Sequence, residues 1–244
     1  MKYILIFLIL ILNLTTTFSQ QVEEIISKHI NAIGGSELWG KVNSISYNGY
    51  VKMNGGQKAK ILNLLTRNPL ANYLEFAWQG MVKKSAFKNG KGWSYSPFNG
   101  KRTADPMNEM SIKTSILNSD PQGHLLNYKT DGSSVEYLGL EDVEGNDVYK
   151  IRLVTKENDM IYYYIDVQTF FILREDIKVK TKDSENTTNS LFSDFRKTEF
   201  GIVLPYFVQG ADSEGNGYGS GSFYEKIEVN NKVNDSLFDM PSKF

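Results

Sequence analysis

The sequence predicts a mainly β protein: a single curved antiparallel sheet, an open half-barrel, with an N-terminal helix and a mid-chain helix covering its concave face. Three observations predict this fold. Apolar and polar residues alternate with a period of two over most of the chain after residue 42, turn-forming stretches separate the alternating segments, and helical spacing occurs in only two places. The chain has 244 residues, 41% of them hydrophobic, which suits one domain with one large core.

The first residues have the three parts of a secretory signal peptide. Lys2 supplies the positive charge, an apolar run follows over residues 3–12, and small residues precede Ser19. The run is shorter than the roughly 20 apolar residues that cross a bilayer. We expect residues 1–19 to be the signal peptide, with cleavage near Ser19 and Gln20; an uncleaved membrane anchor is the alternative.

Cysteine is absent, so the chain forms no disulfide bonds, although export would permit them. Burial of the core must therefore supply the stability. The absence also removes the acylated cysteine that tethers bacterial lipoproteins. No later window is apolar enough to span a membrane as a helix. We therefore expect an exported protein that is not lipid-anchored.

Charge is unevenly distributed along the chain. Residues 50–102 contain ten Lys and Arg but a single acid, whereas residues 103–244 contain 14 basic and 24 acidic residues. Such a basic segment can mark an anionic partner. The alternative is that strands from the two parts lie side by side and neutralise each other. Export makes nucleic acid an unsuitable partner.

An amphipathic helix opens the mature chain. Apolar residues from Val22 to Ile33 follow helical spacing, acids occupy the first turn, and Gly34 and Gly35 end the helix. The second helix is expected over residues 107–117, with Asp105 as N-cap and Pro106 in the first turn. Its apolar residues lie on two sides, so we expect either a helix contacted from two sides or a partly irregular segment.

The strands are predicted to form one meander of sequential hairpins. The first runs from about residue 42 to 53, and one short strand carries Trp93 and Tyr95. Two connections rich in turn formers, residues 182–190 and 210–221, are expected to be mobile tips. The other strands are expected at residues 58–67, 73–79, 81–89, 135–140, 148–155, 160–166, 170–180, 191–198, 203–208 and 222–229.

So many strands cannot form a flat sheet, because twist of roughly 20° per strand pair accumulates until the sheet curls. Strand alternation predicts which residues line the concave side, and Met suits a surface that fits several apolar shapes. Ordinary core filling is the alternative for the same residues. The predicted ligand-binding residues are Leu74, Phe76, Trp78, Trp93, Tyr95, Met107, Met110, Tyr163 and Phe171.

No catalytic or metal site is predicted, and no cofactor. The chain has two His, His29 and His124, and no Cys to complete a metal cluster. Asp120 and Asp166 occupy positions where a turn uses a carboxylate to bind backbone amides. Glu175, at the parity of Phe171, is the one acid on the concave side that could serve in acid/base chemistry.

Seven stretches in order resemble the outer-membrane lipoprotein-sorting protein family, LolA/LolB-like, in its Bacteroidota-type periplasmic form. They are "EEIISKHINAIGG", "KNGKGW", "GHLLNYK", "LEDVEGNDVYKIRLV", "YYYIDVQTFFILR", "FSDFRKTEFGIVLPYFV" and "EKIEVNNKVNDSLFDMP". The resemblance implies that residues 20–244 form one LolA-like lipid-binding domain, a strongly curved open sheet with helices at its mouth.

The resemblance further implies a periplasmic carrier that is not an enzyme. It would bind lipid or lipoprotein acyl chains in a hydrophobic cavity for transfer toward the outer membrane, as a monomer, with a membrane surface or an envelope protein as a second partner. Two other functions remain open: a structural or interaction protein of the envelope on the same fold, and a hydrolase that uses Glu175.

Overall fold

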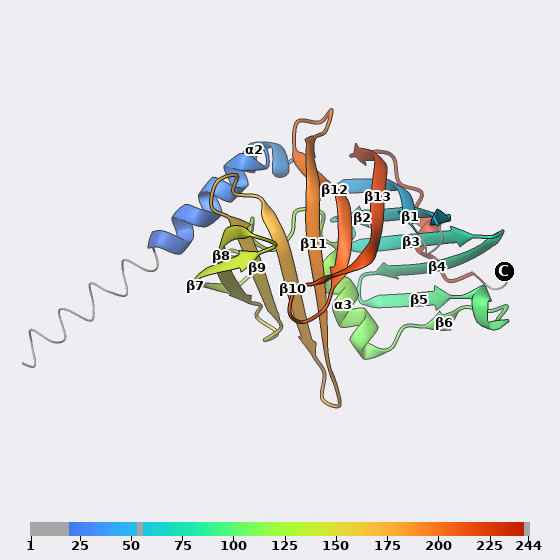
Figure 1. Ribbon diagram of the computed structural model, residues 1–244. Coiled ribbons are helices and arrows are strands. Elements are labelled where there is room, and N and C mark those ends of the chain that lie inside the picture. The colour runs from blue at the N-terminus through green and yellow to red at the C-terminus, as the bar shows by residue number, and fades with distance from the viewer. Residues whose placement is uncertain (1–19, 53–55, 242–244) are drawn as a thin grey trace, which may run out of the picture.

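The computed structural model describes residues 20–52 and 56–241, and the predicted signal peptide lies outside the described residues. These residues form one open antiparallel sheet of thirteen strands with helices on one side (Figure 1). The prediction of a mainly β, open, antiparallel sheet with an N-terminal and a mid-chain helix is confirmed. No helix in the described ranges is long and apolar enough to span a membrane.

The strands fall into two groups along the chain. The first group is β1 Ser44–Lys52, β2 Lys58–Thr66, β3 Ala71–Trp78, β4 Met81–Lys88, β5 Lys91–Tyr95 and β6 Asp105–Pro106. The second group is β7 Ser134–Val143, β8 Asn146–Val154, β9 Met160–Asp166, β10 Ile172–Lys180, β11 Glu185–Lys197, β12 Val203–Ala211 and β13 Gly217–Val229.

The two groups join where the first strand of the chain pairs with the last. The strand order is β6-β5-β4-β3-β2-β1-β13-β12-β11-β10-β9-β8-β7, so β1 pairs with β13 in the middle of the sheet. The predicted single meander is therefore two meanders. β6 and β7, consecutive in the sequence, form the two free edges, and the helix-bearing segment 107–133 connects them (Figure 1).

Gly49 makes the central β1–β13 pairing possible. The register shifts between Asn48 and Gly49, and a Cβ at Gly49 would lie 1.9 Å from the carbonyl oxygen of Phe223. Only a residue without a side chain permits this approach of the two backbones.

Three α-helices lie on one side of the sheet. Residues 20–32 are helical as predicted, α2 spans Ser36–Trp39 and α3 spans Glu109–Ser119. The N-terminal helix buries Val22, Ile25 and Ile26 against β8, β9 and β10, in a core cluster that includes Ile151, Leu153, Ile161, Tyr163 and Ile177. We call the face of the sheet that packs against the helices the inner face, and the opposite face the outer face.

The mid-chain helix starts later than predicted. Asp105 and Pro106 pair with β5 as strand β6, so Asp105 is not the N-cap. The N-cap is Asn108, in extended conformation, and its side chain accepts a hydrogen bond from the Ser111 amide at 2.8 Å. Met110 and Leu117 pack into the core on β9 and β10, while Ile112 lies at the β5 edge, so α3 is contacted from two sides.

Two predicted loops are strands instead. Residues 185–190 belong to β11, with Thr188 opposite Ile177 and Glu185 opposite Lys180. Residues 217–221 begin β13. Both segments are polar and mostly exposed, because the β10–β11 hairpin and the β12–β13 hairpin extend beyond the core, and their backbones pair without burying apolar side chains.

The basic and acidic parts of the chain occupy different halves of the sheet. The basic segment 50–102 forms strands β2 to β5, and among the described residues the first group is hydrogen-bonded to the second only through the pairing of β1 with β13. The alternative of general neutralisation by neighbouring strands is therefore wrong for β2 to β5.

Candidate ligand-binding site

Three of the predicted site residues lie together on the inner face of β3. Asn72 donates a hydrogen bond through Nδ2 to Oγ of Ser119 in α3 at 2.9 Å, which identifies the side of β3 that faces the helix. Strand alternation places Leu74, Phe76 and Trp78 on this same side. All three are half-buried, so apolar surface on the inner face remains accessible.

Phe98 extends this apolar surface and was not among the predicted residues. It belongs to the short helix η2 Pro97–Asn99, and its ring lies 6.2 Å from that of Phe76 and 6.3 Å from that of Trp78 between centroids. Phe98 is 39% exposed. The sequence does show an aromatic residue between two turn signals here, but neither the helical period nor the strand period indicated which way its side chain points.

A pocket of about 710 Å³ lies at the β5 edge of the sheet. Met107 and Ile112 line it from the α3 side, and Trp93 lines it with Phe238 from the C-terminal segment. Met107 lies so close to β5 that a Cβ at Gly92 would be 2.4 Å from its sulfur. The pocket thus brings together two of the predicted residues, Trp93 and Met107.

Trp93 and Tyr95 face the outer side of β5, away from the β3 surface. Trp93 is buried, packs in a cluster with Tyr73 and Phe238, and donates from Nε1 to the Phe238 carbonyl oxygen at 3.0 Å. Tyr95 packs against the same cluster. The short helix η3 Asp235–Phe238 covers this cluster, a role for the C-terminal segment that periodicity did not reveal.

Tyr163 and Phe171 lie apart from the other predicted residues. Tyr163 points to the inner face as predicted but is only 2% exposed within the core. Phe171 points to the outer face, where its ring stacks on Phe195 with centroids 4.5 Å apart. Its neighbours Phe170 and Ile172 pack against the inner core instead, and the bulge between Ile172 and Arg174 reverses the alternation expected along β10.

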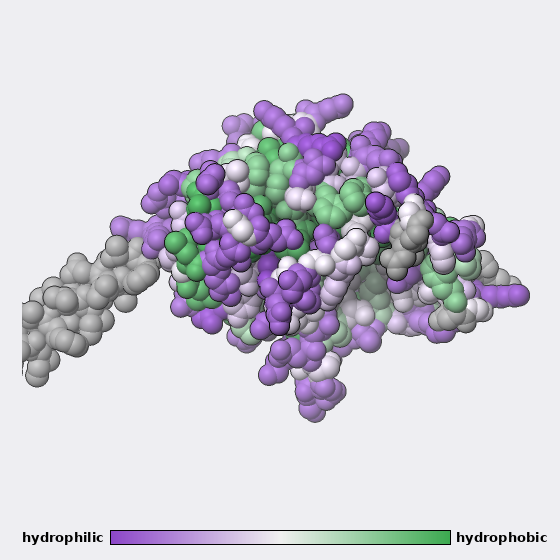
Figure 2. Space-filling model, in the orientation of Figure 1, coloured by the Kyte–Doolittle hydropathy of each residue, from purple (hydrophilic) through white to green (hydrophobic). Residues whose placement is uncertain are grey.

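Phe195 and Phe207 continue this aromatic surface on the outer face. Phe207 lies 4.4 Å from Phe223, and Phe223 lies 5.3 Å from Tyr50, between ring centroids. In Figure 2, hydrophobic residues gather over the upper part of β11 and β12, surrounded by hydrophilic ones. The sheet therefore carries accessible apolar surface on both faces.

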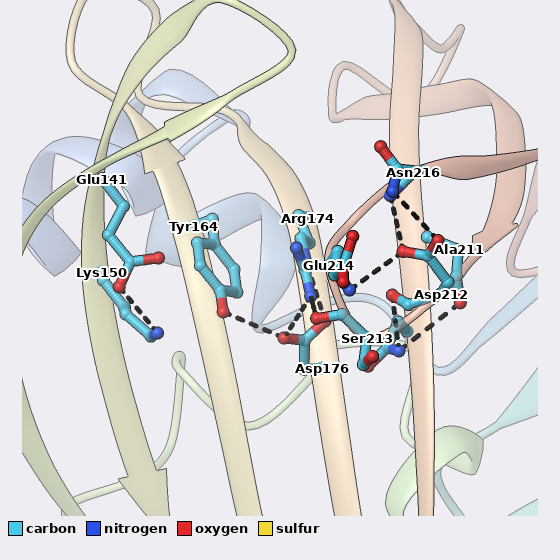
Figure 3. A network of polar contacts seen from close by, with 11 residues as sticks. Glu141, Lys150, Tyr164, Arg174, Asp176, Ala211, Asp212, Ser213, Glu214 and Asn216 are labelled. Atoms are coloured by element: carbon cyan, nitrogen blue, oxygen red, sulfur yellow. Dashed lines mark hydrogen bonds and ion pairs between the residues drawn. The ribbon is translucent and has the colours of Figure 1, made fainter.

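A polar network lies on the outer face beside these aromatic residues (Figure 3). The buried Arg174 guanidinium donates to both carboxylate oxygens of Asp176, at 2.8 and 2.9 Å, and to the Ser213 carbonyl at 3.1 Å. Tyr164 donates its hydroxyl to Asp176 at 2.9 Å. The network holds the β12–β13 turn against β10, and Arg174 and Asp176 are paired within the protein.

Glu175 lies between Arg174 and Asp176 in the sequence and points to the inner face. Its cross-strand partners are Tyr163 on β9 and Ser190 on β11. The side chain is half-buried, and no hydrogen bond or ion pair joins its carboxylate to another residue in the described ranges. Burial, with a smaller contribution from the nearby Asp176, raises the pKa of Glu175 to about 7.

The other polar residues singled out in the sequence have structural roles. Asp166 accepts hydrogen bonds from the Gln168 and Thr169 amides in the β9–β10 turn, and Asp120 accepts one from the Gln122 amide. His29 is buried, and its Nδ1 lies 2.8 Å from the Phe170 carbonyl oxygen. Desolvation by this burial lowers the pKa of His29.

His124 has its Nε2 3.0 Å from the Leu117 carbonyl oxygen, at the end of α3. Within residues 20–52 and 56–241, no cluster of His, Cys, Asp and Glu could hold a metal ion.

The chain resembles known proteins in its structure and not in its sequence. No protein-family model matches this sequence, and no curated protein is significantly similar to it. A DUF1329 family protein from Desulfovibrio piger is 14% identical, with a TM-score of 0.55 over 89% of this chain and 97% of that one. A LolA superfamily protein from Nitrosomonas europaea is 10% identical, with a TM-score of 0.53 over 88% of this chain and 96% of that one.

An outer membrane lipoprotein-sorting protein domain from Vibrio parahaemolyticus is 11% identical, with a TM-score of 0.44 over 88% of this chain and 95% of that one. At such low identities a likeness between structures establishes the fold alone, and the first two matches span nearly the whole of both chains. This chain therefore has a LolA-like fold.

Proposed function

We propose that the protein is an extracytoplasmic carrier that binds the acyl chains of lipids or lipoproteins on the inner face of its sheet, for transfer toward the outer membrane. The observation that carries the proposal is the accessible apolar surface of Leu74, Phe76 and Trp78 beside α3. A sheet whose helices served only to fill a core would bury these side chains. Met107, Met110 and Tyr163 remain proposed members of this site, whereas Trp93, Tyr95 and Phe171 point to the outer face and lie outside it.

The free energy of acyl-chain burial determines how the cargo can be transferred. Burial of an acyl chain of about 16 carbons contributes up to roughly 12 kcal/mol, at about 0.8 kcal/mol per CH₂ group. A chain bound this tightly rarely escapes into water. Release therefore requires an acceptor that buries the same chain, so that the net free energy of the hand-over is small.

α3 is the element best placed to gate such a hand-over. It spans the inner face from β3, through the Asn72–Ser119 hydrogen bond, to the β9–β10 end, where Lys113 pairs with Asp159 at 2.9 Å. Few polar contacts hold it, and its N-terminal end adjoins the pocket at the β5 edge. Displacement of α3 would widen access to the β3 surface without breaking strand pairing.

Extraction of the protein after purification from its native envelope tests the proposal. Mass spectrometry of the organic extract should find lipid or acylated peptide in a stoichiometric amount. Phe76→Ala should weaken binding of a neutral alkyl probe at least fivefold, whereas Phe207→Ala, an equally half-buried Phe on the outer face of β12, should not. Protein without extractable lipid, together with equal probe affinity in both variants, contradicts the proposal.

An interaction protein of the envelope is the second candidate, and the β7 edge favours it. β7 is ten residues long, has no strand on its free side among the described residues, and exposes Leu138 and Leu140 by 41% and 62%. An exposed strand edge can pair with an extended segment of another chain. Recovery of one stoichiometric protein partner without lipid, lost on Leu140→Lys, would favour this function.

A further inference from the structure

The inner face holds one carboxylate whose role the fold does not explain. Among the described residues, Glu175 has no hydrogen-bonding or ionic partner, although its neighbours on the inner face, Tyr163 and Ile177, belong to the apolar core. A carboxylate among apolar side chains loses hydration without gaining a partner, so its presence at this position calls for a specific explanation.

The direction of Glu175 is fixed by its neighbours in β10. Arg174 and Asp176 are locked to the outer face by their mutual ion pair and by Tyr164 and Ser213. Residue 175 must then point inward, opposite Tyr163 and Ser190. A one-residue slip that would move Glu175 outward would place the buried Arg174 in the apolar core, so the network enforces the inward position.

The charged groups that face this region leave Glu175 without a cation. Lys113 of α3 is engaged by Asp159 at 2.9 Å and by the Lys180 carbonyl oxygen at 2.7 Å. His124, in the loop after α3, has its Nε2 beside the Leu117 carbonyl oxygen. Tyr163 is neutral at physiological pH because burial raises its pKa. The carboxylate is also half-buried, so a bound molecule can reach it.

We infer that Glu175 receives the polar end of the bound molecule, and that this end is a primary ammonium group attached to the apolar chain that the inner face holds. This inference rests on the proposed carrier function and names the ligand class: a cationic or zwitterionic amino-amphiphile. An ammonium group supplies three donors and the opposite charge, which an isolated carboxylate in apolar surroundings lacks. An anionic headgroup would be repelled at the same position.

The pKa of Glu175 is consistent with a bound ammonium group. Burial, with a smaller contribution from Asp176, raises the pKa of Glu175 to about 7. A bound ammonium group would lower that pKa again, since it favours the charged carboxylate.

Equilibrium binding of three probes with the same twelve-carbon chain tests the inference: dodecylamine, dodecanol and dodecanoate, each below its micelle concentration, at pH 8.5. At this pH Glu175 is mainly ionised and a primary amine is mainly protonated. The full-length mature protein should bind the amine at least tenfold more tightly than the alcohol, and the alcohol more tightly than the carboxylate.

Glu175→Gln should reduce the amine-to-alcohol preference to within twofold. Glu185→Gln, which removes an exposed acid at the start of β11, should keep the preference. Thermal unfolding of both variants verifies their folding.

Alcohol binding without a preference for the amine, or a preference that persists in Glu175→Gln, overturns this inference and leaves the carrier function standing. Failure of all three probes to bind overturns both.

Discussion

Asn72 of β3 and Ser119 of α3 are joined by a hydrogen bond of 2.9 Å, the link between the mid-chain helix and the half of the sheet that carries the accessible apolar surface. Ser119 is completely buried, and its hydroxyl also donates to the Ser115 carbonyl oxygen. The bond lies beside the proposed site, so it couples the stability of the helix cover to access to that site.

Asn72→Ala should therefore loosen α3 without unfolding the sheet. Loss of one hydrogen bond to a buried hydroxyl costs about 1 kcal/mol. We expect faster hydrogen exchange for the amides of α3 than in the wild type, with unchanged exchange in β8 and β9, and faster dissociation of an alkyl probe. Exchange that accelerates equally throughout the sheet would contradict a local role for the bond.

Glu175 should make the stability of the protein depend on pH. Its pKa is raised to about 7 in the folded protein, whereas the ordinary pKa of 4.5 applies in the unfolded chain. The folded state thus binds the proton more tightly, so stability is highest below about pH 4.5, falls as the pH rises to 7, and is constant above it for this group. The loss is at most about 3 kcal/mol.

Glu175→Gln should remove this dependence. Denaturant unfolding should find the variant more stable than the wild type at pH 8 and within about 0.5 kcal/mol of it at pH 4.5. An equal difference at both pH values would show that the carboxylate does not titrate between them. Glu185→Gln, the exposed control, should follow the wild-type curve.

Asp176→Asn should destabilise the protein strongly. Asp176 and Arg174 are 6% and 8% exposed, and removal of one charge from a buried pair leaves the other uncompensated, at a cost of about 3 kcal/mol. Guanidinium unfolding measures the change. A loss below 1 kcal/mol would mean that Tyr164 and the Ser213 carbonyl oxygen suffice to hold the guanidinium group.

The basic half of the sheet should bind anionic membranes through its outer face. Lys52 on β1 lies opposite Lys58 on β2, and Lys60 follows on the same face; none of the three pairs with an acid in the described ranges. Each lysine near an anionic surface contributes about 1 kcal/mol. Replacement of all three by Gln should reduce association with phosphatidylglycerol vesicles at least tenfold at 0.05 M salt.

The matched control replaces Lys156, Lys182 and Lys232, three exposed lysines of the other segments, by Gln. It removes the same net charge and should weaken association by less than threefold. An equal effect of both triple variants, or association that does not fall with added salt, would contradict a localised basic surface.

Local patterns were sufficient to predict most strands and their pairing in sequential hairpins, but not the pairing of β1 with β13. The alternation at Leu74, Phe76 and Trp78 correctly predicted a common face, since burial acts on side chains residue by residue. The pairing of β1 with β13 joins residues about 180 positions apart, and no hairpin turn marks it. Gly49 alone hinted at a close approach of two backbones, and its partner, Phe223, could not be read from the sequence.

The members of the site were likewise predicted only in part, because local irregularities of the strands decide which way a side chain points. Phe171 was assigned to the inner face by its alternation with Leu173, but the bulge between Ile172 and Arg174 interrupts the alternation, and Phe171 points outward. Glu175 was assigned to the inner face by its parity with Phe171, and it does point inward although Phe171 points outward, because the bulge between them reverses that parity. Trp93 and Tyr95 were predicted to lie on the concave side, but on the short strand β5 they point to the outer face, where they pack with Phe238.

Photo-crosslinking with a tritiated C16 alcohol that carries a mid-chain diazirine tests most directly whether the inner face holds apolar cargo. The cross-linked peptides are mapped by mass spectrometry after competition with unlabelled alcohol. Cargo held on the inner face should give competed labels on the peptides that contain Leu74, Phe76 and Trp78 and on those from α3. Labels confined to the outer-face aromatic residues Phe195, Phe207 and Phe223, or labels that competition does not reduce, would contradict it.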